Sequence, residues 1–340
     1  MKRFRLKKLM VFTAALALVL TGCSSSGNHT SSPETSQQVS EPAANATVEI
    51  TDIYGTVTVP VNPKNVVSLD NRTFETLSDW GIELAAVPKG VMPADSPYYQ
   101  DSAVQDIGDH REPNLEIIAA VNPELVIVGQ RFAGYYEDIK ALVPDAAVIN
   151  LNFELSEEAG KSGATLVEGL KNSTIALGMI FDKNEEAQTL NADFDQAIQD
   201  AKAAYNGTDK IMSVVVSGGD IGFAAPLSGR VWGPMYDIFG WTSALEVDGS
   251  SSDHKGDDIS VEAIAQSNPD WMMVLDRDAA ISSEEENVPA KDVIDQSPAL
   301  KNTMAVSKEQ IIYAPNDTYT NESIQTYLEL FENIASAFSK

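Results

Sequence analysis

One segment of this sequence occurs twice, and the repeat constrains the fold more than any other feature. Residues 115–131 read LEIIAAVNPELVIVGQR and residues 261–277 read VEAIAQSNPDWMMVLDR, so the copies align without a gap at an offset of 146 positions. The offset pairs Arg131 with Arg277. A chance repeat with two unrelated surface arginines is the alternative, but short repeats seldom extend this far without a gap.

Each copy predicts a helix followed by a buried strand. The helix should stop at Asn-Pro, because the residue before a proline is disfavoured in the α conformation. The apolar run that follows is typical of a strand buried on both faces of a parallel sheet. Arg131 and Arg277 then lie just beyond the carboxyl ends of two strands, where open α/β sheets bind ligands. We therefore expect an α/β fold with two lobes, each offering one cation to a shared cleft.

The N-terminus has the pattern of a processing segment. Residues 1–22 begin with basic side chains and continue with a mostly apolar run from Leu9 to Leu20. That run is shorter than the roughly 20 residues needed to span a bilayer. Leu20-Thr21-Gly22-Cys23 resembles the lipobox of bacterial lipoproteins, whose cysteine is lipidated and becomes the mature N-terminus. The resemblance implies a lipoprotein signal peptide over 1–22 and a lipid anchor on Cys23. An ordinary cleaved signal peptide is the alternative.

The rest of the chain divides by composition and periodicity. Residues 23–47 comprise the cysteine and a stretch rich in Ser, Thr, Asn and Pro, which predicts a disordered tether. We expect an N-terminal α/β lobe over 48–165 and a C-terminal α/β lobe over 207–340. Between them, residues 166–206 carry a helical apolar stripe whose second part alone would span roughly 30 Å. This region is predicted to be a single rigid helical strut that joins the lobes.

Charge and cysteine content exclude several classes of partner. The formal net charge is −27, so nucleic acid is not an expected partner, because binding it requires the neutralisation of phosphates. Cys23 is the only cysteine, which excludes a disulfide within the chain and a thiolate metal cluster. Basic residues are scarce, and this makes arginines that converge on a cleft more noticeable.

With these features in hand, the chain resembles the substrate-binding lipoproteins of bacterial iron ABC importers. The resemblance covers about residues 48–338 and is closest to the group that binds ferric catecholate siderophores of the enterobactin and petrobactin types. Its specific motifs are NPDWMMVLDRDA at 268–279 and APNDTY at 314–319. The resemblance implies a class III binding protein with two α/β lobes joined by a long rigid helix and a ligand cleft between them.

The resemblance also implies the site residues. In this group three arginines line the cleft, and a histidine and a tyrosine can reach the iron. The matching positions here are Arg131, Arg230, Arg277, His254 and Tyr319.

The chemistry of these residue types agrees with such a ligand. Guanidinium groups pair with the oxygens of a ferric triscatecholate, which carries roughly three negative charges. A phenolate and an imidazole could complete the coordination of a tetradentate ferric complex. Simpler interpretations are that His254 is a solvated loop histidine and Tyr319 a packing tyrosine. His110 is a weaker candidate, and His29 lies in the predicted tether.

Two glutamates occupy equivalent positions of the repeat. Glu116 and Glu262 stand near the start of each predicted helix. In this importer class one glutamate on each lobe docks against arginines of the permease dimer, so the resemblance assigns them that role. A solvated glutamate that is favoured by the helix dipole is the alternative.

The sequence thus predicts a non-enzymatic receptor, monomeric and lipid-anchored on the outer face of the cell membrane, with no resident cofactor. The resemblance implies that it captures a ferric siderophore and delivers it to an ABC importer. Haem, cobalamin or a bare divalent metal are alternative ligands, although bare metal sites use several His and carboxylates together. A secreted enzyme is a further alternative, and we find no Gly-x-Ser-x-Gly elbow, His-Glu-x-x-His or phosphate loop in the sequence.

Overall fold

The computed structural model describes residues 46–156, 158, 160–281 and 288–340. The predicted signal peptide, Cys23, His29 and nearly all of the predicted tether lie outside the described residues. The described residues form one compact unit. Within the described part of the chain, no helix is both long enough and apolar enough to cross a membrane.

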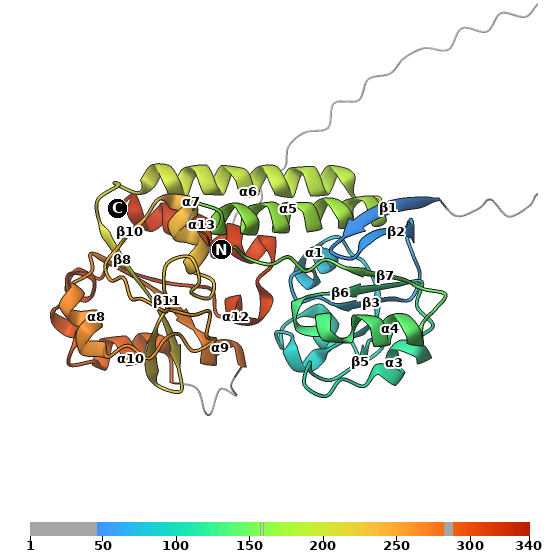
Figure 1. Cartoon of the computed structure of the whole chain (residues 1–340), viewed down its shortest axis with the longest axis horizontal. Helices are drawn as coiled ribbons and strands as arrows, with labels where there is room; N and C mark the ends of the chain where they lie inside the picture. The colour runs from blue at the N-terminus through green and yellow to red at the C-terminus, as the bar shows by residue number, and fades with distance from the viewer. Residues whose placement is uncertain (1–45, 157, 159, 282–287) are drawn as a thin grey trace, which may run out of the picture. The chain divides into compact units, whose positions relative to one another are not determined.

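The first half of this unit, residues 46–152, forms an α/β lobe that we call the N-lobe (Figure 1). Its central sheet has the strand order β5-β4-β3-β6-β7, with every neighbouring pair parallel. An antiparallel hairpin, β1-β2, precedes this sheet in the chain. The strands are β1 (Thr47–Asp52), β2 (Gly55–Pro60), β3 (Val66–Leu69), β4 (Leu84–Val87), β5 (Gln105–Asp106), β6 (Leu125–Val128) and β7 (Ala147–Asn150).

The second α/β lobe, residues 207–323, is called the C-lobe. Its sheet has the order β10-β8-β11-β12, again parallel throughout. One further strand, β9, pairs antiparallel with β8 through the turn at Gly218-Gly219, and the sequence analysis did not identify it. The strands are β8 (Lys210–Ser217), β9 (Asp220–Phe223), β10 (Thr242–Ser243), β11 (Trp271–Asp276) and β12 (Ile311–Tyr313).

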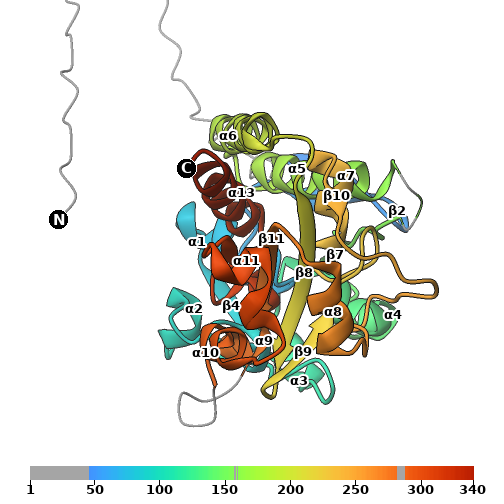
Figure 2. The ribbon, with the colours of Figure 1, turned by 90° about the vertical axis from the view of Figure 1, so that its left-hand side faces the viewer.

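Helices cover both sheets. Those of the N-lobe are α1 (Phe74–Asp79), η1 (Lys89–Val91), α2 (Pro97–Gln100), α3 (Leu115–Ala120), η2 (Gln130–Tyr135) and α4 (Tyr136–Leu142). Those of the C-lobe are α7 (Gly233–Phe239), α8 (Val261–Ser267), α9 (Arg277–Ile281), α10 (Ala290–Gln296), η3 (Leu300–Asn302), α11 (Met304–Ser307) and α12 (Thr318–Asn321). A helical layer of α5 (Ser162–Ile180), α6 (Asn184–Ala204) and α13 (Ile324–Phe338) lies along one side of both lobes, at the top of Figures 1 and 2.

The repeated segment folds in the same way in both lobes. One copy forms α3 and β6, and the other forms α8 and β11. Asn122 and Asn268 have left-handed backbones, with φ of 46° and 45°, so each helix ends where a proline follows. Asparagine tolerates this conformation better than most residues. The prediction of a helix that feeds a buried parallel strand is therefore confirmed for both copies.

The helical layer differs from the predicted single strut. Its first two helices form an antiparallel hairpin, because Lys171 on α5 donates to Asp195 on α6 and also contacts Asn191 through its carbonyl oxygen. The chain turns at Asp182, which has a left-handed φ of 53°. Leu166 and Leu170 at the start of α5 are buried in the C-lobe core, while Leu177 and Ile180 at its end are buried in the N-lobe core. Two helices, rather than one, thus cross between the lobes.

This arrangement also changes the expected lobe boundaries. Asp237 on α7 of the C-lobe accepts hydrogen bonds from the backbone of Gly160 (3.1 Å) and Ser162 (3.0 Å). Residues 160–165 therefore pack on the C-lobe, although the sequence assigned them to the N-lobe. The spacing of apolar residues predicted the buried faces of the helices correctly. It does not show in which direction a helix runs between the lobes.

Helix α13 completes the layer and also connects the lobes. Its first turn contacts α1 of the N-lobe, where Thr76 donates to Gln325 at 2.9 Å. Further along, Phe331 stacks on Phe194 of α6 with ring centroids 5.5 Å apart, inside the C-lobe core. Aromatic pairs at this separation add stability beyond their buried area. The helical layer thus holds the two sheets with their carboxyl edges on either side of one pocket.

Candidate functional site

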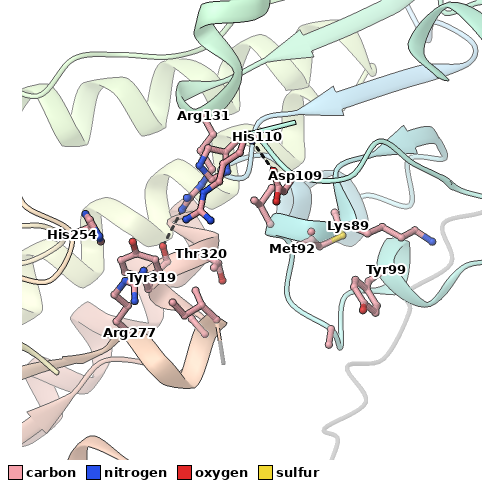
Figure 3. A pocket seen from close by; sticks show the side chains of 16 residues that line it. Lys89, Met92, Tyr99, Asp109, His110, Arg131, His254, Arg277, Tyr319 and Thr320 are labelled. Atoms are coloured by element: carbon pink, nitrogen blue, oxygen red, sulfur yellow. Dashed lines mark hydrogen bonds between the residues drawn. The ribbon is translucent and has the colours of Figure 1, made fainter. Parts of the chain in front are cut away.

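A pocket of about 740 Å³ lies between the two lobes (Figure 3). Its lining residues come from the loops and short helices that follow the strands of both sheets. The N-lobe contributes Lys89, Gly90, Val91, Met92, Ala94, Tyr99, Asp109, His110, Arg111 and Arg131, and the C-lobe contributes His254, Arg277, Ala280, Ile281, Tyr319 and Thr320.

The two repeat arginines both line this pocket. Arg131 lies in η2, three residues after the end of β6, and Arg277 is the first residue of α9, directly after β11. Both strands run parallel to their neighbours, so the arginines leave the carboxyl edges of the two sheets. The prediction that the repeat brings one cation from each lobe to a shared cavity is confirmed by the geometry. Their contact with a ligand remains a prediction.

Tyr319 lies at the centre of the cationic part of the pocket (Figure 3). It belongs to the short helix α12. Its carbonyl oxygen accepts from Nη2 of Arg131 and from Nη2 of Arg230, both at 3.2 Å. Its ring is flanked by the guanidiniums of Arg230 at 4.4 Å and Arg277 at 5.1 Å. Cations at this distance from a ring face are attracted to its π electrons, so they fix the orientation of the tyrosine.

Arg230 does not line the pocket, although the sequence placed it there. Its side chain is only 17% exposed and forms an ion pair with Glu322, with Nη2 and Oε1 2.6 Å apart. Burial favours the neutral form of Arg230, but Glu322, Tyr319 and Tyr327 together outweigh burial and raise the pKa of the guanidinium. Arg230 therefore supports Tyr319 from behind, and its charge is already paired within the protein.

Two histidines lie in the pocket wall. His254 is half exposed, and its Nδ1 is 3.9 Å from the carboxylate of Asp253. His110 contributes from the N-lobe, and its buried Nδ1 has no hydrogen-bond partner among the described residues. Burial lowers the pKa of His110, and the charge of Arg131 lowers it further, so its imidazole is neutral. The sequence ranked His110 below His254, whereas the structure brings both histidines to the same cavity.

The pocket has the opposite charge to the rest of the protein. Lys89, Arg111, Arg131 and Arg277 line it, and Asp109 is the one carboxylate among its described lining residues. The ammonium of Lys89 donates to a backbone carbonyl at 2.8 Å and Arg111 is exposed at the rim. A chain of net charge −27 thus concentrates positive charge in one cleft. Such a cleft attracts anionic ligands and lowers their free energy when bound.

Burial and neighbouring charges both act on the guanidinium of Arg131. Burial lowers its pKa, the nearby Glu322 opposes this effect, and Arg230 adds to it. Its Nε is buried without a hydrogen-bond partner in the described residues. A buried guanidinium with unused donors has lost part of its hydration. A charge-assisted hydrogen bond to an anion would replace that hydration and lower the free energy.

A polar cluster beneath the pocket was missed by the sequence analysis. Asp70, Asn71 and Arg72 follow β3 and are all buried. Asn71 donates to the carbonyl oxygens of Thr320 (2.9 Å) and Asn321 (3.0 Å), so it ties the N-lobe to α12. The position directly after a central buried strand was an available signal for these residues. No local pattern in the sequence signals their partners on α12.

The described residues contain no group of three or more His, Cys, Asp or Glu side chains arranged to hold a metal ion. Comparison with known proteins identifies the family of the chain. The sequence profile of periplasmic binding proteins matches residues 66–318. The chain belongs to the periplasmic binding protein family.

The relatives of this periplasmic binding protein include full-length matches. It is 27% identical over 345 residues to the petrobactin-binding protein YclQ of Bacillus subtilis (strain 168), with complete coverage of both chains. It is 26% identical over 330 residues to the ferric-anguibactin-binding protein FatB of Vibrio anguillarum, with 94% of each chain covered. The crystal structure of YclQ matches with a TM-score of 0.72 at 25% identity, covering 87% of this chain and 99% of that chain. The chain thus shares the two-lobed fold of these proteins.

The two predicted docking glutamates of this periplasmic binding protein are both solvent-exposed. Glu116 lies in the first turn of α3, and Glu262 lies in the first turn of α8. In an α/β unit the helix that precedes a strand begins near the carboxyl edge of the sheet, because helix and strand run in opposite directions. The permease-docking role of both residues remains a prediction.

Proposed function

We propose that this protein is an extracytoplasmic receptor that captures a ferric siderophore and delivers it to an ABC importer. The observation that carries the proposal is the interlobe pocket, in which Arg131 and Arg277 flank Tyr319 in a strongly acidic protein. The names of the full-length relatives, which bind petrobactin and ferric anguibactin, support iron complexes as the ligand class.

A catecholate siderophore is the ligand chemistry that we favour. A ferric triscatecholate presents roughly three negative charges on oxygens that guanidiniums can reach with charge-assisted hydrogen bonds. Arg131 and Arg277 would bind these oxygens from opposite sides, and Lys89 and Arg111 would attract the complex at the rim. Haem and cobalamin fit less well, because they would need a more apolar lining than these cations provide.

Direct contact with iron is a finer part of the proposal. Tyr319 and His254 both line the pocket and would supply a phenolate and an imidazole to a tetradentate ferric complex. Iron binding would displace the phenolic proton, since only the deprotonated oxygen is a strong ligand. A hexadentate complex has no open coordination position, and it would be held by the arginines alone.

Delivery and attachment complete the proposed function. A lipid on Cys23 would hold the receptor at the outer face of the cell membrane, with residues 24–47 as the tether. Glu116 on one lobe and Glu262 on the other would dock a monomeric receptor on a permease dimer. The charge-reversal variant Glu116→Arg should abolish stimulation of the reconstituted importer while ligand affinity stays unchanged, and retained stimulation would exclude the docking role.

Titration of tryptophan fluorescence tests the ligand class. Purified protein is titrated with ferric catecholate, hydroxamate and citrate complexes and with each iron-free siderophore. The ferric catecholate should bind most tightly. The iron-free siderophore should bind at least about tenfold more weakly, because its catechol oxygens are protonated and are not gathered around a metal. Equal affinity for all ferric complexes would remove the catecholate preference, and binding of none would refute the proposed function.

A further inference from the structure

Glu322 is a buried carboxylate that pairs with two arginines beneath the pocket, Arg72 and Arg230. Its side chain is 6% exposed and lies between two arginines from different lobes. Oε1 is 2.6 Å from Nη2 of Arg230 in the C-lobe, and Oε2 is 3.7 Å from Nη2 of Arg72 in the N-lobe. One carboxylate therefore joins the two halves of the protein directly below the pocket.

The backbone at Glu322 is unusual for a glutamate. It ends α12 in the left-handed conformation, with φ of 51° and ψ of 28°. Glycine or asparagine is usual at such a position, because a Cβ atom is strained there. Glu322 nevertheless adopts this conformation, and its side chain reaches an arginine on each lobe.

The electrostatic environment keeps Glu322 ionised. Burial would raise the pKa of this carboxyl, but the charges of Arg230, Arg72 and Arg131 together outweigh burial and lower the pKa. Arg72 is held on its other side as well, because its guanidinium stacks 4.2 Å from the ring centroid of Phe153. Glu322, Arg230 and Arg72 thus form a set of fixed charges that is largely shielded from water.

We propose that Glu322 is a positioning residue of the ligand cleft, which holds Arg230 behind Tyr319 and fixes the N-lobe to the C-lobe through Arg72. The inference rests on the proposed function, since it concerns how that same site is assembled for a ferric siderophore. The charge of Arg230 is paired with Glu322, and its guanidinium contacts the aromatic ring and the carbonyl oxygen of Tyr319. The anionic ligand then meets Arg131 and Arg277, and not all three predicted arginines.

The variant Glu322→Gln separates a positioning role from a simple effect of charge, because the two predict opposite changes in ligand affinity. Removal of a negative charge below an anion site should tighten binding if only the net charge matters. Loss of the position of Arg230 and Tyr319 should weaken binding instead. We expect Glu322→Gln to bind a tetradentate ferric catecholate about tenfold or more weakly, with a smaller loss for a hexadentate complex. Unchanged or tighter binding would overturn the proposal.

Glu309→Gln is the matched control. Glu309 is an exposed glutamate with a left-handed φ of 58°, so its substitution removes the same charge from the same backbone conformation at a distance from the pocket. Its affinity should equal that of the wild type. The variant Glu322→Asp keeps the charge but withdraws it by one methylene, and it should show an intermediate loss for the tetradentate complex. Wild-type affinity in Glu322→Asp would contradict the positioning role.

A measurement without ligand distinguishes failure of this inference from failure of the proposed function. Urea unfolding of Glu322→Gln, Arg72→Gln and the double variant forms a double-mutant cycle. If Glu322 joins the lobes through Arg72, the second substitution should cost less once the first is present, whereas additive costs would refute the connection. If the wild type bound no ferric siderophore, the proposed function would fall, and the cycle would still decide whether Glu322 joins the lobes.

Discussion

Arg131 of the N-lobe donates a hydrogen bond to the carbonyl oxygen of Tyr319 of the C-lobe at 3.2 Å. The two residues lie in the same pocket wall, so this contact joins the lobes at the place where a ligand would bind. The backbone of Tyr319 is thereby held from the N-lobe, while its ring is held by cations of the C-lobe. Ligand affinity and lobe arrangement are expected to depend on the same few residues.

Arg277→Ala should weaken the binding of every anionic ferric complex. Arg277 faces the pocket, and its Nη1 is held by the hydroxyl of Ser217 at 3.1 Å. Loss of one charge-assisted contact should cost about 1.5–3 kcal/mol of binding free energy. Isothermal titration measures this cost, with Lys291→Ala on the exposed face of α10 as the control. Equal affinities for Arg277→Ala and Lys291→Ala would show that Arg277 does not contact the ligand.

Arg230→Ala should lower the free energy of unfolding of the protein. Its removal leaves Glu322 buried with only the more distant Arg72. Breaking a buried ion pair at one partner costs about 3–5 kcal/mol of unfolding free energy. Urea denaturation of the ligand-free protein measures this loss, with exposed Arg111→Ala as the reference. A loss below about 1 kcal/mol would mean that the pair behaves as a surface ion pair.

Tyr319→Phe should discriminate between ligands by their denticity. The ring would keep its place between Arg230 and Arg277, so the substitution removes only the hydroxyl. Affinity for a tetradentate ferric complex should fall more than affinity for a hexadentate one, because only the former has open coordination positions. His254→Ala should show the same pattern. Equal losses for the two ligand types, measured by fluorescence quenching, would argue against direct coordination of iron.

Asp70→Asn should change the pH dependence of stability. Burial raises the pKa of Asp70 from 3.8 to about 6, against the opposing charges of Arg72 and Arg131, and Glu322 adds to the rise. The folded state therefore binds an extra proton between these values, so the stability from this group is present at low pH and lost as pH rises through 6. The difference between the two values corresponds to about 3 kcal/mol.

Unfolding in urea at about pH 4 and about pH 8 tests this prediction. Asn keeps an oxygen that can accept from the backbone N–H of Arg72, which Asp70 binds at 3.1 Å. The variant should therefore gain stability relative to the wild type as pH rises. A variant that is less stable than the wild type by the same amount at both pH values would show that Asp70 is a well-paired anion.

The sequence predicted the parts of the fold that depend on local pattern. The apolar run after each Asn-Pro predicted a buried parallel strand, and both form as β6 and β11. Arg131 and Arg277 were placed correctly because the repeat carries the same helix, turn and strand in each lobe. Short helices such as α12 were missed, since a single turn has no periodicity to detect.

Contacts between distant parts of the chain were not predictable in this way. Arg230 was matched to a family position, but its partner Glu322 lies far away in the sequence and follows no motif. The direction of α5 could not be predicted for the same reason. An apolar stripe shows which face of a helix is buried, but it does not show which element packs against that face. The electrostatic role of a residue is decided by such neighbours. Sequence patterns therefore found the cations but not the distant carboxylate that pairs with Arg230.

The structure of the complex tests the central claim most directly. Crystals grown with a ferric catecholate siderophore should show the complex between the lobes, with its oxygens about 3 Å from the guanidiniums of both Arg131 and Arg277. Arg230 should remain paired with Glu322 and make no contact with the ligand. A siderophore bound away from this pocket, or one held by neither arginine, would contradict the account.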